Sequence, residues 1–153
     1  MVTIYTDGSA RGNPGPGGYG VVMISGEHRK EISEGYRLTT NNRMELLSVI
    51  VALEALKNNN TSVVIHSDSK YVVDSVEKKW VFGWEKKNFS GKKNSDLWRR
   101  FLLVYRKHSV RFVWVKGHAD TVENNHCDEL AVSASFRADL KVDSWYELNE
   151  YKK

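Results

Sequence analysis

The order of strand-like and helix-like segments is the feature of this sequence that most narrows its fold. Three β-rich runs come first, at residues 2–6, 19–25 and 30–38, and turn signals at 8–18 and 26–27 separate them. Runs joined by such turns predict an antiparallel meander. Helical and strand patterns then alternate along the chain. This order predicts a mixed sheet with helices on its faces, in the α/β or the α+β class.

The alternating part begins with a helix signal. Polar residues at 39–42 precede a mostly apolar stretch without Gly or Pro, which predicts a buried helix over 44–57. The other elements that the patterns predict are strands at 62–66 and 110–115 and helices starting near Ser67, at 96–107 and at 124–140, the last with Ala138 facing inward.

The composition is that of one globular domain. With 153 residues, 41% hydrophobic and 27% charged, the chain is long enough to bury a real core. We expect a single domain at 1–140 and a tail at 141–153, in which Trp145, Tyr146 and Leu148 are candidates for docking on the body.

Neither a membrane protein nor a secreted one is favoured. The longest apolar run, 49–53, is too short to span a bilayer, and no basic region followed by a long apolar stretch opens the chain. The single cysteine, Cys127, cannot form an internal disulfide and favours a reducing compartment. We therefore expect a cytoplasmic monomer.

Positive charge is concentrated in one segment. Residues 78–107 hold ten Lys or Arg and two acids, a net +8, which leaves −4 for the remainder of a chain with a total of +4. A basic segment on an otherwise acidic body suggests a polyanionic partner such as nucleic acid. Charge alone leaves a solvated lysine-rich face open as the alternative.

Two aspartates stand at the ends of predicted strands. Asp7 ends the first strand and Asp68 ends the fourth. Each has an ordinary structural explanation, because Asp7-Gly8 favours a tight turn and Asp68 could cap a helix. If the two strands are neighbours, however, both carboxylates lie at one sheet edge and repel each other. A cation would relieve that repulsion.

Two further acids lie on predicted helices. Glu45 is on a narrow polar stripe of a buried helix, although a capping box with Asn42 would explain it as well. Asp128 starts the last helix, where the helix dipole alone favours an acid. Four carboxylates without a thiolate or histidine cluster suit Mg²⁺ or Mn²⁺ rather than zinc.

Five blocks of sequence are more specific together than any one of them alone. They are Tyr5-Thr6-Asp7-Gly8-Ser9 with Gly12-Asn13-Pro14-Gly15, Thr40-Asn41-Asn42-Arg43-Met44-Glu45-Leu46, Ser67-Asp68-Ser69, Trp114-Val115-Lys116-Gly117-His118, and Asn124 with Cys127-Asp128-Glu129-Leu130-Ala131. In this order, over residues 2–138, the chain resembles type 1 ribonuclease H. The segment 80–98 is similar to the basic handle of the bacterial form.

The resemblance implies a ribonuclease H-like fold, a mixed sheet in strand order 3-2-1-4-5 with helices on both faces. It implies an endoribonuclease that hydrolyses the RNA strand of RNA–DNA hybrids with two Mg²⁺ ions, for which Mn²⁺ can substitute, leaving 5′-phosphate and 3′-hydroxyl ends. Such an enzyme removes RNA primers and the RNA of R-loops. The residues implied in catalysis are the metal-binding carboxylates Asp7, Glu45, Asp68 and Asp128, and His118 on a loop beside them.

The resemblance also implies contacts with the hybrid. They are Asn13, Asn41 and Asn42 for the minor groove, Thr40 and Asn94 for a DNA phosphate, and Trp80, Trp84, Lys86, Lys87, Lys92 and Lys93 in a handle at about 78–98. Core packing is the expectation for Trp98 and Trp114. Lys70 departs from the family, which usually has Gln there, so a phosphate contact could replace a minor-groove contact. The loop 119–122 departs as well, and its Asp120 adds a charge near the metals.

Other functions stay open on the same scaffold. A non-catalytic hybrid-binding module would require the absence of a carboxylate, and all four are present. The blocks at 41–45 and around His118 disfavour another nuclease or a strand-transfer enzyme. Met1 and the handle favour a free-standing enzyme over the ribonuclease H part of a reverse transcriptase.

Overall fold

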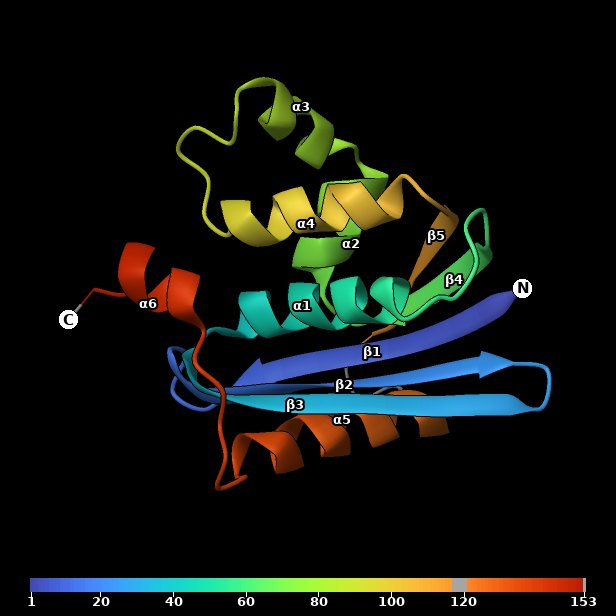
Figure 1. Cartoon of the computed structure of the whole chain (residues 1–153), viewed down its shortest axis with the longest axis horizontal. Coiled ribbons are helices and arrows are strands. Elements are labelled where there is room, and N and C mark those ends of the chain that lie inside the picture. Colours follow the sequence, from blue (N-terminus) through green and yellow to red (C-terminus); the bar gives the residue numbers. More distant parts are fainter. Residues whose placement is uncertain (117–120, 153) are drawn as a thin grey trace.

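The chain folds around a five-stranded mixed sheet with the strand order β3-β2-β1-β4-β5 (Figure 1). The computed structural model describes residues 1–116 and 121–152. The strands are β1 (Val2–Ala10), β2 (Gly15–Ser25), β3 (His28–Thr39), β4 (Ser62–Ser67) and β5 (Ser109–Trp114). The helices are α1 (Asn41–Glu54), α2 (Lys70–Glu77), α3 (Trp80–Lys86), α4 (Ser95–Tyr105), α5 (Val122–Ser135) and α6 (Ser144–Asn149). The predicted fold and strand order are confirmed.

Strand direction explains how one edge of the sheet can carry a site. β1, β2 and β3 pair antiparallel, as the meander predicts. β1 and β4 run parallel, with Ile4 opposite Ile65, and β5 runs parallel to β4. The carboxyl ends of β1 and β4 therefore lie side by side, which allows Asp7 and Asp68 to approach each other.

Two glycines allow helices to lie directly on the sheet. α1 and α5 cover opposite faces of it (Figure 1). A Cβ atom on Gly8 in β1 would lie 2.3 Å from the carbonyl carbon of Met44 in α1. On the other face, a Cβ on Gly20 would lie 2.4 Å from the carbonyl oxygen of Cys127 in α5. Acidic side chains on both helices can therefore come close to the backbone of β1.

Helix α1 is buried on nearly all sides, as its apolar sequence predicts. It begins after Thr40, whose hydroxyl accepts a hydrogen bond from the Arg43 amide. One side of α1 packs on β1 and β2, and the other side packs on α4. Ile50 of α1 and Trp98 and Phe101 of α4 are fully buried in this layer. The expected core position of Trp98 is confirmed.

The glycine-rich connection after β1 is shorter than the predicted turn at 8–18. β1 runs to Ala10 and β2 starts at Gly15. Gly17 pairs with Ala10 across the antiparallel ladder. Main-chain pairing of glycines leaves no alternation of side chains, so the sequence pattern could not reveal these strand ends.

Helix α5 ends at Ser135, earlier than predicted. The chain then returns to the edge of β3, where the Lys141 amide donates to the carbonyl of Gly35 and the Arg37 amide donates to the carbonyl of Lys141. These main-chain bonds compete with continuation of the helix. The predicted inward position of Ala138 is wrong, because that residue is exposed.

The patterns do not predict the short helices α3 and α6, because one or two turns are too few to show a period. α6 lies in the tail. Its Tyr146 is buried, which confirms docking for that residue. Leu148 is 84% exposed, so its predicted docking is wrong. None of the helices in the described ranges has the length and apolar character of a membrane span.

A buried arginine ties the tail to the body. The guanidinium of Arg43 in α1 donates to Asp143 of the tail at 2.7 Å and to Asp96 of α4 at 2.8 Å. It also donates to the side-chain oxygen of Asn94 at 3.3 Å. The Asp143 carboxylate accepts a further hydrogen bond from the Thr39 hydroxyl at 2.9 Å. This ion cluster joins α1, α4 and the chain before α6.

Arg43→Ala should lower the free energy of unfolding by roughly 3–5 kcal/mol, because it leaves two acids without their cation in a buried setting. Urea denaturation at neutral pH measures the loss. Arg37→Ala is the matched control, since Arg37 binds Glu147 in a similar bidentate pair but is exposed. Its expected cost is below about 1 kcal/mol. Equal, small losses in both variants would contradict a stabilising role for the buried cluster.

Candidate metal centre and nucleic-acid interface

Three carboxylates from separate elements meet at the edge formed by β1 and β4. One oxygen atom each of Asp7, Glu45 and Asp68 lies within 4.8 Å of the others. Asp7 comes from β1, Glu45 from α1, and Asp68 from the connection between β4 and α2. The structure thus brings together three of the four predicted carboxylates.

The ordinary structural explanations for these three acids do not apply. Asp7 is inside a strand, paired with Gly20, and not in a turn. Ser69 caps α2, where its hydroxyl accepts from the Val72 amide, so Asp68 is not the cap. Thr40 caps α1, which excludes the predicted capping-box alternative for Glu45.

The fourth carboxylate, Asp128, lies at the rim of the same site. It lines a small cavity of about 50 Å³ together with Asp7 and Asp68. Asp128 is exposed and lies in the second turn of α5, because that helix begins at Val122. The expectation that Asp128 starts the helix is therefore wrong, and the helix dipole no longer accounts for an acid there.

Burial and mutual repulsion make the trio electrostatically unfavourable. Desolvation and the neighbouring Asp68 carboxylate raise the pKa of Asp7 to about 7, although the Gly8 amide donates to Asp7 at 2.8 Å. Burial, followed by the charges of Asp7 and Asp68, raises the pKa of Glu45 well above its ordinary value. Within the described chain, Oε1 of Glu45 and Oδ1 of Asp68 are buried without a hydrogen-bond partner.

This donor set fits a hard divalent cation. Carboxylate oxygens are the ligands that Mg²⁺ and Mn²⁺ take in proteins, and orphaned buried oxygens gain a partner when such an ion binds. Bringing a positive charge into the trio would also offset the repulsion between the acids. Asp7, Glu45 and Asp68 can therefore hold a metal ion, with Asp128 at the rim.

Asn124 belongs to the site, although the sequence patterns predict no site role for it. It lines the cavity beside Asp7 and Asp128, and its Oδ1 is buried without a partner among the described residues. Its spacing in the sequence could have identified it, because Asn124 stands four residues before Asp128 and so shares its face of α5. His118 and Asp120 lie outside the described residues.

The predicted minor-groove and phosphate residues line a second cavity, of about 280 Å³. Its walls are Asn13, Pro14, Thr40, Asn42, Lys93, Asn94, Tyr146 and Glu150. The fifth predicted residue, Asn41, is not one of the residues that line this cavity. Its side-chain oxygen accepts from the Ala10 amide at 2.6 Å, and its own amide donates to the Asn13 side chain at 2.9 Å.

The predicted handle projects beyond α2 and α4 (Figure 1). Its lysines at 86, 87, 92 and 93 are all exposed, as expected. Trp80 is 47% exposed, whereas Trp84 packs edge-on against Trp98 with ring centroids 5.8 Å apart. Trp80, Trp84, Lys87 and Lys92 share a hollow of about 380 Å³. One tryptophan is thus available to a ligand and the other also anchors the handle.

Lys70 and Trp114 form an exposed pair next to the carboxylates. The Lys70 ammonium lies 4.7 Å from the centroid of the Trp114 ring, within the range of a cation–π contact. Trp114 pairs with Ser67, at the carboxyl end of β4. Trp114 is 44% exposed, so the expectation that it packs in the core is wrong.

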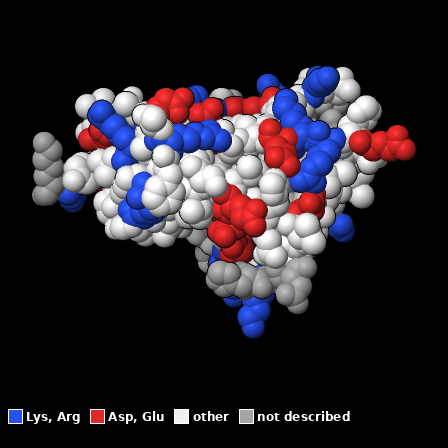
Figure 2. Space-filling model, turned by 90° about the horizontal axis from the view of Figure 1, so that it is seen from below, with Lys and Arg blue, Asp and Glu red and all other residues white. Residues whose placement is uncertain are grey.

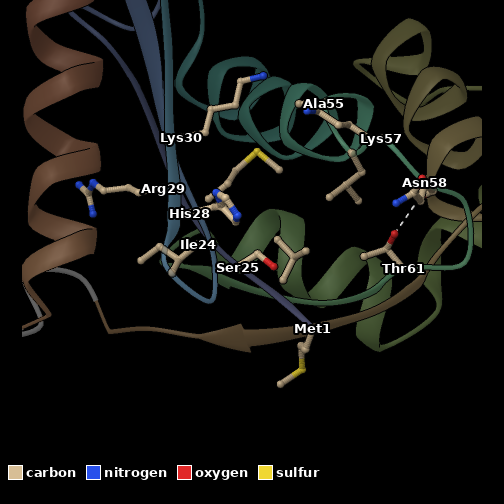
Figure 3. Close-up of a pocket in the computed structure, with 13 residues that line it drawn as sticks. Met1, Ile24, Ser25, His28, Arg29, Lys30, Ala55, Lys57, Asn58 and Thr61 are labelled. Carbon is tan, nitrogen blue, oxygen red and sulfur yellow. Dashed lines mark hydrogen bonds between the residues drawn. The ribbon is translucent and has the colours of Figure 1, made fainter.

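Among the described residues, Asp7, Glu45 and Asp68 are the one group of acidic, histidine or cysteine side chains placed to hold a metal ion. On the α5 side, acidic and basic side chains are interspersed (Figure 2). Glu123 of α5 pairs there with Arg29. A larger pocket of about 580 Å³ lies at the opposite end of β1, lined by apolar residues such as Met1 and Ile24 and by polar or basic ones such as His28, Arg29 and Lys57 (Figure 3). It contains none of the predicted site residues.

Comparison with known proteins places this geometry in a family. A family model described as RNase H matches residues 1–136. A ribonuclease H of Syntrophus aciditrophicus (strain SB) is 55% identical over 151 residues, which cover 95% of this chain and 87% of the relative. A ribonuclease H of Trichodesmium erythraeum (strain IMS101) is 49% identical over 95% of this chain and 96% of its own.

Solved structures agree with the sequence relatives. LC9-RNase H1, described as a type 1 RNase H with the type 2 active-site motif, aligns with a TM-score of 0.77 and 34% identity over 88% of this chain and 71% of its own. LC11-RNase H1, in complex with an RNA/DNA hybrid, aligns with a TM-score of 0.69 and 27% identity over 88% of this chain and 96% of its own.

Asp7→Asn should raise the melting temperature of the metal-free protein at about pH 8 by a few degrees. The pKa of about 7 in the folded state exceeds the value of about 3.9 for an unfolded aspartate, so ionisation of Asp7 opposes folding as the pH rises between these values. The gain should shrink as the pH falls and vanish below about pH 4, where the carboxyl is protonated in both states.

Calorimetric scans in chelator across this pH range measure the effect. Asp139→Asn removes an exposed aspartate after α5 and is the control, with no expected change. A lower melting temperature for Asp7→Asn at pH 8 would instead assign Asp7 a structural role.

Proposed function

We propose a reaction for this chain, which belongs to the ribonuclease H family. It hydrolyses the RNA strand of RNA–DNA hybrids and leaves 5′-phosphate and 3′-hydroxyl ends. The observation that carries the proposal is the convergence of Asp7, Glu45 and Asp68 oxygens within 4.8 Å at the sheet edge. The hybrid bound to the similar LC11-RNase H1 supports the substrate class.

The carboxylates give the site its metal requirement. Asp7, Glu45, Asp68 and Asp128 would hold two divalent ions, Mg²⁺ or in its place Mn²⁺. Bound there, the ions supply Lewis-acid stabilisation of an in-line displacement at phosphorus and a water of lowered pKa. The amide oxygen of Asn124 faces the same cavity and can orient a water beside Asp128.

Side-chain amides give the site its preference for RNA. Asn13, Asn41 and Asn42 can both donate and accept hydrogen bonds, which suits contact with a 2′-hydroxyl and with base edges in the minor groove. The Asn41 side chain is already held by the Ala10 amide, so its position is set before substrate binds. Thr40 and Asn94 bind a phosphate of the DNA strand.

Cations around the site bind the backbone without reading sequence. Lys86, Lys87, Lys92 and Lys93 contact phosphates along the handle, with Trp80 and Trp84 beside the strand. Lys70, resting on Trp114, contacts a phosphate next to the carboxylates. His118 transfers a proton or assists product release, a role that rests on its sequence block alone.

The proposal also includes the domain organisation, the oligomeric state, the cellular location and the biological role of the enzyme. A single catalytic domain at 1–140, with the handle at 78–98 and the tail at 141–153, works as a monomer in the cytoplasm. It removes RNA primers and the RNA of R-loops.

A substrate panel tests the proposed reaction. Labelled RNA–DNA hybrid, RNA duplex and DNA duplex are each incubated with Mg²⁺, Mn²⁺ or chelator. Cleavage of the RNA strand of the hybrid with either metal, and of nothing with chelator, supports the proposal. Hybrid binding without cleavage under all conditions would favour a binding module, and cleavage of DNA duplex would favour another nuclease.

Asp68→Asn should abolish hybrid cleavage, by at least roughly a thousandfold, because the metal site loses a charged ligand. Hybrid binding in chelator should persist, since the phosphate contacts lie elsewhere. Gel-shift titrations and cleavage assays on the same preparation separate the two effects. Asp74→Asn, on the following helix and outside the cluster, is the control and should keep full activity. Retained cleavage in Asp68→Asn would contradict the assignment.

Replacing Lys86, Lys87, Lys92 and Lys93 together by Ala should raise KM and leave kcat at saturation nearly unchanged. Such contacts serve ground and transition states alike. Removing each ammonium that binds a phosphate should lower the slope of log K against log salt by roughly 0.9. The measurement is hybrid affinity over a salt series.

The control for the handle removes the same charge elsewhere. Lys30, Lys57, Lys107 and Lys141 are exposed outside the handle, and changing these four to Ala should leave the salt slope near that of the wild type. If the two quadruple variants behave alike, the handle is only a solubilising face.

A further inference from the structure

A carboxylate of the tail lines the cavity that the proposed function gives to a DNA phosphate. Oε2 of Glu150 accepts a hydrogen bond from the backbone amide of Asn94 at 2.8 Å. Glu150 also lines the cavity of about 280 Å³ that contains Thr40, Lys93 and Asn94. Glu150 and the residue whose amide it binds therefore both belong to the wall of this cavity.

The tail holds Glu150 in place through contacts made earlier in the chain. Asp143 is anchored by the buried guanidinium of Arg43, and Tyr146 is buried against the body. α6 runs from there to Asn149, so its last turn delivers Glu150 to the start of α4. In Figure 1, α6 lies next to the end of α4 where the handle returns.

The surroundings of Glu150 suit an anion rather than a carboxylate in particular. The Asn94 amide donates a hydrogen bond, and Thr40 and the exposed Lys93 belong to the same cavity wall. An amide, a hydroxyl and a lysine bind phosphate oxygens as readily as carboxylate oxygens. A phosphate that takes the Asn94 amide must displace Glu150 or lie beside its negative charge.

We propose that Glu150 is an internal competitor for the substrate phosphate and thereby sets the affinity for the hybrid. The proposal rests on the proposed function, because it assigns the cavity to a phosphate of the hybrid. Each binding event exchanges the hydrogen bond from the Asn94 amide to Glu150 for one to a phosphate oxygen. The apparent affinity is then lowered by the fraction of molecules in which Glu150 occupies the amide.

Glu150→Gln tests this idea without removing the side chain. The glutamine oxygen can still accept from the Asn94 amide, so the packing of the tail is kept, but the negative charge is gone. Hybrid binding should tighten by roughly tenfold, the order expected for one charge-assisted hydrogen bond. KM should fall with it, while kcat at saturating hybrid should stay within about twofold of the wild type.

Glu147→Gln is the matched control. Glu147 stands one turn earlier on α6, carries the same charge and binds the exposed Arg37 outside the cavity. A general reduction of repulsion between the tail and nucleic acid would change both variants equally. A local competition at Asn94 would change Glu150→Gln alone.

A third variant tests whether the gain in hybrid affinity depends on the cavity. Lys93→Ala removes a cation from the wall, so the gain from Glu150→Gln should be smaller in the Lys93→Ala background than in the wild type. Melting temperatures of all variants show whether the tail remains docked.

Two results would overturn the inference. Unchanged hybrid affinity in Glu150→Gln, with or without a lower melting temperature, would leave Glu150 as a structural contact of the tail. Equal gains in hybrid affinity in Glu147→Gln and Glu150→Gln would show that the effect comes from the overall charge of the tail. Failure of the wild type to bind or cleave hybrid would overturn the proposed function instead, so the two failures are distinguishable.

Discussion

The candidate site depends on the close approach of helix α1 to strand β1 at Gly8. A Cβ atom there would lie 2.3–2.6 Å from backbone atoms of Met44 and Glu45, so any larger residue would push the helix away from the sheet. With glycine, Glu45 comes to the level of Asp7 and its carboxylate is buried beside it. The parallel pairing of β1 with β4 then adds Asp68 to the same edge. Backbone geometry, and not attraction between the acids, brings these charges together.

Helix α1 has opposite electrostatic surroundings at Arg43 and at Glu45, which is only two residues later. Around Arg43, two carboxylates surround a buried cation, and the ion cluster joins α1 to α4 and the tail. Around Glu45, carboxylates face one another and burial raises the pKa of both Glu45 and Asp7. The first arrangement stabilises the metal-free fold, whereas the second destabilises it. An ion that binds the folded state alone would offset that cost and stabilise the protein by mass action.

The sequence predicts features that depend on residue type at element ends, and it misses those that depend on tertiary contact. Asp7 and Asp68 are visible as acids that follow β-rich runs, and a likeness to a family supplies the strand order that makes them neighbours. Asn124 is missed because an asparagine near a helix start has a common capping explanation. Trp114 is misplaced because it ends β5 at the edge of the sheet, where its side chain is covered only in part. The end of α5 and helix α6 depend on pairing with β3 and on Arg43, neither of which leaves a local pattern.

Helix α1 also links the proposed phosphate cavity to the carboxylate trio. Thr40, at the start of α1, faces the proposed phosphate cavity, and Glu45, five residues later, belongs to the carboxylate trio. A rise of about 1.5 Å per residue separates them by roughly 7.5 Å along the helix axis. Asn94 is held to this helix by its side-chain oxygen, which accepts from Arg43 at 3.3 Å, and its side-chain nitrogen donates to Tyr71 of α2 at 3.0 Å. A phosphate bound at the Asn94 amide would therefore sit at a set distance from the carboxylates. Because Glu150 competes for that amide alone, it can tune how tightly the hybrid binds without moving the carboxylates.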